Sequence, residues 1–103
     1  MNKQQAFDTV VGEFRSDMSI SAAKAPTRFA ATAPNGARYS VSVSWGQRYV
    51  RTGEPSKLRI YVEQGPHTIH SGEWRSIDQA QLAAQIAIST IRNTNYTVQG
   101  ELL

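Results

Sequence analysis

Hydrophobic residues in the N-terminal segment recur with the period of an α-helix. They follow the spacing i, i+3, i+4, i+7 and i+11, which gathers them in one stripe: Phe7, Val10, Val11, Phe14 and Met18. Polar and charged residues occupy the opposite side of the same helix. We therefore predict a helix over residues 3–18, followed by a loop in which the proline at position 26 rules out further helix.

The period changes to two in the middle of the chain, as is typical of strands with one buried face. The clearest run lies at 39–45; a shorter run at 28–33 precedes it and a third follows at 57–63. The Asn35-Gly36 pair between the first two runs predicts a tight hairpin turn, because both residues tolerate positive φ. Gly46 predicts a bulge or bend. A weaker fourth strand is expected at about 67–72, after the turn at residues 65–66.

A second helix has an explicit start signal. Ser76 fits the N-cap and Gln79 the N3 position of a capping box, and Asp78 lies in the first turn, where the helix dipole favours negative charge. Alanines and isoleucines form a broad apolar face that ends near residues 92–93. Leu82 and Ile86 fall towards the flank, so we expect this helix to be covered on more than one side. The tail, residues 95–103, is expected to form a short strand or to be loose.

These patterns predict an α+β fold. One domain over residues 1–103 would contain an N-terminal helix, a three- to four-stranded antiparallel sheet, and a C-terminal helix packed on one face of that sheet. The other face of the sheet is then left to solvent or to a partner.

The composition of the chain excludes several kinds of site and several classes of protein. The 103 residues contain no cysteine, so no disulfide, thiolate nucleophile or cysteine-ligated metal is available. No apolar run approaches the roughly 20 residues that cross a bilayer. The N-terminus is polar and shows no signal peptide. We expect a cytoplasmic protein without a membrane partner.

Motifs for catalysis are missing from the sequence. It has no nucleophile elbow, phosphate-binding glycine loop or dinucleotide fingerprint, and its carboxylates are scattered. His67, His70 and Glu73 have ligand-like spacing for a helix, but they fall in a predicted strand, where residues three apart face opposite sides. We therefore expect a protein that is not an enzyme and that holds neither a metal nor another cofactor.

Positive charge is concentrated in the strand region. The net charge is +3, yet residues 24–59 hold seven cations against one carboxylate. Guanidinium forks and hydroxyls suit phosphate oxygens, and aromatic rings stack on bases. An ordinary solvated sheet face is the alternative interpretation, since basic side chains also discourage pairing between strand edges. The candidate residues for binding nucleic acid or another partner are Arg28, Arg38, Arg48, Tyr49, Arg51, Lys57, Arg59 and Tyr61.

The order helix, strands, helix resembles the double-stranded-RNA-binding domain, and related sheet-plus-helix DNA-binding arms, over about residues 5–92. In that family a lysine cluster at the start of the second helix grips phosphates. Residues 76–81 carry no positive charge here. Any binding of nucleic acid is therefore expected on the sheet face.

Two functions fit these observations. The first is a small binding protein whose basic sheet face engages nucleic acid or an acidic surface of a nucleic-acid-handling complex. The alternative is a phage or mobile-element inhibitor, similar to anti-CRISPR proteins, that blocks a host protein or nucleoprotein complex by direct contact. A homodimer that pairs two edge strands is a further expectation.

Overall fold

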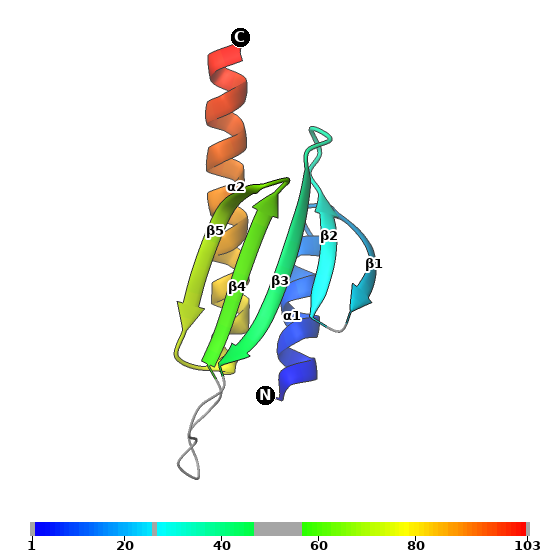
Figure 1. Cartoon of the computed structure of the whole chain (residues 1–103), viewed down its shortest axis with the longest axis vertical. Coiled ribbons are helices and arrows are strands. Elements are labelled where there is room, and N and C mark those ends of the chain that lie inside the picture. The colour runs from blue at the N-terminus through cyan, green and yellow to red at the C-terminus, as the bar shows by residue number, and fades with distance from the viewer. Residues whose placement is uncertain (1, 26, 47–56, 103) are drawn as a thin grey trace.

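The computed structural model describes residues 2–25, 27–46 and 57–102 (Figure 1). Along the chain, one helix comes before the five strands and another comes after them. The elements are α1 (Lys3–Arg15), β1 (Ser19–Ala25), β2 (Arg28–Thr32), β3 (Arg38–Gly46), β4 (Lys57–Gln64), β5 (His67–Trp74), a 3₁₀ turn η1 (Ile77–Gln79) and α2 (Ala80–Leu102). The α+β class with helices at both ends is confirmed.

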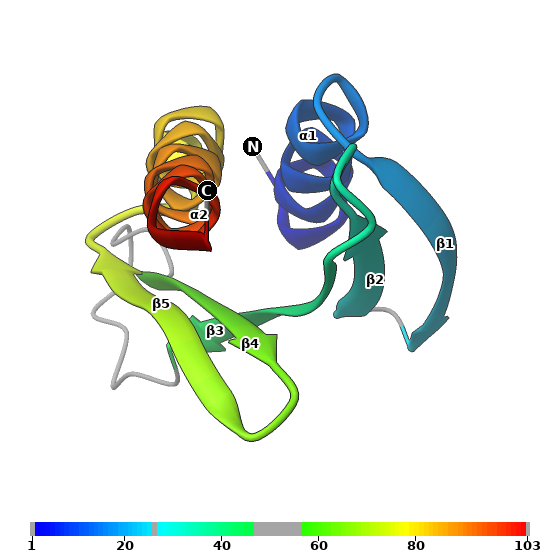
Figure 2. The same cartoon turned by 90° about the horizontal axis from the view of Figure 1, so that it is seen from above.

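The strands form one antiparallel meander in the order β1-β2-β3-β4-β5. Figure 2 shows that the sheet is curved and that both helices lie side by side on its concave face. We call this the inner face of the sheet and the opposite, convex side the outer face. No described element covers the outer face, whereas the inner face and the helices enclose the core.

Helix α1 begins with a capping box that the sequence pattern did not single out. The Asn2 side chain accepts from the Gln5 backbone N–H at 2.8 Å, and the Gln5 side chain accepts in return from the Asn2 backbone N–H at 2.9 Å. The helix ends at Arg15, three residues before the predicted end. Its stripe packs on the sheet, where the Phe14 ring meets Phe29 edge to face at a centroid distance of 5.3 Å.

Helix α2 lies close to the sheet because its inner side is made of small residues. Ala80, Ala83, Ala84 and Ala87 are fully buried, and Ile91 continues the same side. Alanine brings a helix axis nearer to a sheet than leucine does, since no long side chain separates the two backbones. The predicted apolar face is therefore confirmed as the buried side of α2, which packs on the sheet and on α1.

Two expectations for this helix were wrong, and a third, the N-cap at Ser76, holds for the 3₁₀ turn that precedes the helix. Ser76 caps the 3₁₀ turn by accepting from the Asp78 N–H at 3.1 Å, and α2 starts only at Ala80. Leu82 and Ile86 are 48% and 39% exposed, so no described element covers that side. The tail is neither strand nor loop, because the helix continues to Leu102; Figure 1 shows this end projecting past the sheet.

The sheet has five strands rather than the predicted three or four. The additional strand is β1, where the sequence predicted a loop. It pairs with β2 from Ser19↔Thr32 to Ala25↔Arg28 across an irregularity after Ser21. Ile20 is the only large apolar residue in β1, so alternation gave no strand signal there.

The predicted turn at Asn35-Gly36 is confirmed, with Gly36 at φ 89°. Gly46 forms no bulge: it pairs regularly with Lys57, and a Cβ on Gly46 would lie 2.7 Å from the Lys57 Cβ. The glycine is therefore required by a close approach of two strands. Within the described ranges, no helix is both long enough and apolar enough to span a bilayer.

Truncating Phe14 tests the contact between α1 and the sheet. Phe14→Ala should lower the free energy of unfolding by about 3–5 kcal/mol, because it leaves a cavity against Phe29. Phe14→Leu should cost less. Leu82→Ala lies on the uncovered side of α2 and should change the free energy of unfolding by no more than about 0.5 kcal/mol. Urea unfolding measures all three, and a large loss in Leu82→Ala would show that this side is covered in solution.

Candidate functional site

The outer face is built by the alternate residues of the strands. In β3 these are Ser40, Ser42 and Ser44, all half-buried, while Tyr39, Val41 and Val43 fill the core between them. Serines are short, so the middle of the outer face carries little side-chain bulk. The longer side chains of the outer face surround these serines. They come from β2, from β4 and from the first residue of β3.

Two arginines stand on the β2–β3 side of this surface. Arg28 lies opposite Ser42, and its Nε donates to the Ser42 Oγ at 3.3 Å. Arg38 lies opposite Thr32 at the start of β3. Both side chains are exposed, and neither forms an ion pair with any described residue. Their charges are therefore open to a ligand.

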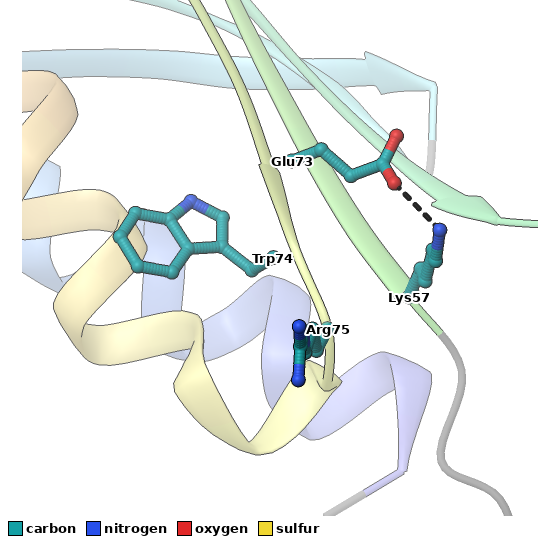
Figure 3. Close-up of a pocket in the computed structure, with 4 residues that line it drawn as sticks. All are labelled: Lys57, Glu73, Trp74 and Arg75. Carbon is teal, nitrogen blue, oxygen red and sulfur yellow. Dashed lines mark hydrogen bonds and ion pairs between the residues drawn. The ribbon is translucent and has the colours of Figure 1, made fainter.

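Two further cations, on β4, share one carboxylate. The Lys57 Nζ donates to Glu73 Oε1 and the Arg59 Nε donates to Glu73 Oε2, each at 2.8 Å. These hydrogen bonds, first from Lys57 and then from Arg59, hold the pKa of the Glu73 carboxyl below its usual value. Figure 3 shows the Lys57–Glu73 contact at an open pocket of about 570 Å³ that Trp74 and Arg75 also line.

Tyr61 lies in the middle of the outer face. Its neighbours across the two strand pairs are Ser42 on β3 and Ser71 on β5. Arg28 continues the same row beyond Ser42. The residues directly opposite the half-buried Tyr61 are therefore short on both neighbouring strands.

The structure thus brings five of the eight predicted binding residues to one surface. We define the basic face by these five residues: Arg28, Arg38, Lys57, Arg59 and Tyr61. The other three lie outside the described residues: Arg48, Tyr49 and Arg51.

The sequence did not predict that Glu73 pairs with cations of the basic face. Glu73 lies directly opposite Arg59 in the β4–β5 pairing and neutralises part of the face. It is 14 residues away from Arg59 along the chain. Only the register of the last hairpin, including its irregularity between Val62 and Glu63, places the carboxylate there. Counting charges by segment therefore could not pair it with the cations.

The inner side of β5 is polar where it borders the core. His70 lies opposite Val62, and Gly72 and Trp74 follow on the same side. A Cβ on Gly72 would lie 2.9 Å from the His70 Nε2 and 3.5 Å from the Trp74 Nε1, so both rings fold over the glycine. Both nitrogens are buried without a hydrogen-bond partner in the described structure. Burial lowers the pKa of the His70 imidazole, because the charged form loses solvation.

This placement separates His67, His70 and Glu73, the three residues whose spacing would suit metal ligands on a helix. His70 faces the core, whereas Glu73 faces outwards and is held by Lys57 and Arg59. Within the described part of the chain, no three histidine, aspartate or glutamate side chains are grouped to hold a metal ion.

Comparison of this chain with family models, with curated proteins and with solved structures gives no match. What the outer face does must therefore be argued from its own residues.

The buried His70 ring predicts a stability that falls with acid. Its pKa is lowered in the folded state, so the unfolded chain binds the proton more readily. The stabilising contribution is complete above the ordinary pKa of 6.5 and is lost as the pH falls through the lowered folded-state pKa. Urea unfolding at pH 7.5, 6.5 and 5.5 should show a smaller acid-induced loss in His70→Gln than in the wild type.

His67→Gln is the matched control, because His67 is an exposed residue at the start of the same strand. This variant should keep the pH dependence of the wild type. An identical pH dependence in wild type and His70→Gln would contradict the assignment to His70.

Proposed function

We propose that the basic face binds nucleic acid, single-stranded chains in preference to duplexes, and that the protein is a binding module rather than an enzyme. The observation that carries this proposal is the arrangement of the uncovered face. Arg28 and Arg38 are exposed beside a floor of serine side chains, and the Tyr61 ring lies among the same residues.

Charge and hydrogen-bonding chemistry favour a phosphate backbone as the ligand. Guanidinium groups donate in a fork that matches two phosphate oxygens, and serine hydroxyls donate one hydrogen bond each. Successive outward residues of a strand lie about 6.8 Å apart. The rows of Arg38, Arg28 and Arg59 therefore spread cations along most of β3, so several phosphates of one chain could be contacted at once.

The aromatic ring and the curvature favour a single strand. Unpaired bases can stack on Tyr61, whereas the bases of a duplex are already stacked on each other. The outer face is convex (Figure 2). A flexible strand can follow such a surface, but a stiff double helix would touch it only over a short length.

Fluorescence anisotropy with labelled 20-nucleotide single strands and the matching duplexes tests the proposal. Binding should weaken steeply with salt, with a log–log slope of about −0.7 for each phosphate neutralised on a single strand. Arg28→Gln combined with Arg38→Gln should lower the magnitude of the slope by about 1.4, because two phosphate contacts are lost.

The control replaces two cations of α1, Lys3 and Arg15, by glutamine. This variant has the same net charge as the test variant, but its changes lie on the other side of the sheet. It should bind as the wild type does. Absence of binding at low salt would overturn the proposal and leave a protein partner as the ligand, as for an inhibitor of a host complex.

Variants of Tyr61 distinguish the contribution of base stacking to binding from the contribution of charge. Tyr61→Leu should weaken single-strand binding by about 1–3 kcal/mol with little change in the salt slope, because the loss of a stacked base releases no counterions. Tyr61→Phe keeps the ring and should restore most of the affinity. Equal affinities in the leucine and phenylalanine variants would show that the ring contacts no base.

A further inference from the structure

Glu73 accepts hydrogen bonds from two cations of the basic face. Its two carboxylate oxygens accept separately, one from Lys57 and one from Arg59, each at 2.8 Å. The two non-bridging oxygens of a phosphodiester offer acceptors in a similar arrangement. The same two donors are therefore positioned for a phosphate group, and Glu73 occupies the place that this group would take.

The ion pairs around Glu73 are accessible to exchange. The side chains of Glu73 and Arg59 are 42% and 45% exposed, and Lys57 is 27% exposed. Exposed ion pairs of this kind contribute little to folding and are weakened by salt. An incoming anion can replace the carboxylate without opening the core, because all three side chains stand on the outer face.

The surroundings supply room and further positive charge. The pocket of about 570 Å³ is lined by Lys57 and Glu73 together with Trp74 and Arg75 (Figure 3). Arg75 follows the end of β5 and is exposed. A ligand that displaced Glu73 would thus meet three cations at one end of the basic face: Lys57, Arg59 and Arg75.

We propose that Glu73 mimics a nucleic-acid phosphate in the free protein and that a phosphodiester of the bound strand displaces it from Lys57 and Arg59. This inference rests on the proposed function, because the ligand is the same nucleic acid. It adds a phosphate site and a mechanism that limits binding. The carboxylate keeps weak polyanions from the site and is released when a strand also engages Arg28, Arg38 and Tyr61.

The test is the affinity of Glu73→Gln for the labelled single strand in low salt. The glutamine keeps the size of the side chain but removes the charge that competes for the two cations. The variant should bind about 5- to 10-fold more tightly than the wild type. Thermal unfolding of each variant checks that it is folded, and Glu73→Ser provides a second way to remove the carboxylate.

Glu63→Gln is the matched control, because it removes the same charge from the same face. Glu63 lies on β4 opposite Ser40 and Thr68 and forms no ion pair with any described residue. General electrostatics predicts equal gains for the two glutamine variants. The inference predicts a gain for Glu63→Gln of about twofold or less.

A second comparison assigns the effect to the two cations. In a protein that already carries Lys57→Gln and Arg59→Gln, adding Glu73→Gln should give no more gain than adding Glu63→Gln. Weaker binding by Glu73→Gln in the wild-type background would overturn the inference, since Glu73 would then serve to hold the cations in place. Equal gains for the two glutamate variants would overturn it as well.

Failure of the proposed function gives a different result. In that case neither the wild type nor Glu73→Gln binds the strand, even in low salt. If the wild type binds and Glu73→Gln binds with the same affinity, the proposed function stands and only the role of Glu73 is refuted.

Discussion

The pairing of β3 with β4 is the constraint on which the rest of the structure depends. Seven consecutive residue pairs, from Ser40↔Glu63 to Gly46↔Lys57, run without a bulge through the middle of the sheet. Side chains alternate along both strands, so this register decides at once which residues enter the core and which face outwards. A slip of β3 by one residue would expose Val41 and Val43 and bury the serines between them. Core and candidate site are therefore fixed by the same hydrogen bonds.

The two faces of the sheet differ because they meet different neighbours. Both helices fit within the concave side, where α2 buries four alanines and Ile91 and α1 inserts the Phe14 ring. The convex side has no such cover and carries serines, threonine and long charged residues. These polar side chains keep a broad uncovered surface in water without a large apolar patch. The same property leaves hydroxyls and arginines available to a ligand.

Regular periodicity explains which elements could be predicted. Stripes of large apolar residues located α1, β3 and β4, and the Asn35-Gly36 pair located the turn between β2 and β3. Two segments without such stripes were missed. β1 has one large apolar residue, Ile20, and is held mainly by its pairing with β2. The last turns of α2 extend past the sheet, and the sequence did not predict them as helix (Figure 1). At Ser76 the local cap signal was real, but a 3₁₀ turn precedes the α-helix and changes which N–H is accepted.

The charges of the candidate site could also be predicted only in part from the sequence. Alternation within single strands placed Arg28, Arg38, Lys57, Arg59 and Tyr61 on one face without any knowledge of pairing. The balance of charge on that face depends on which strands are neighbours, and the irregular β4–β5 register sets this balance by bringing Glu73 to Arg59. Two of the four cations of the basic face are paired as a result, and two are open. A basic segment in a sequence is thus only an upper bound on the charge that a folded surface offers to a polyanion, since cross-strand carboxylates subtract from it.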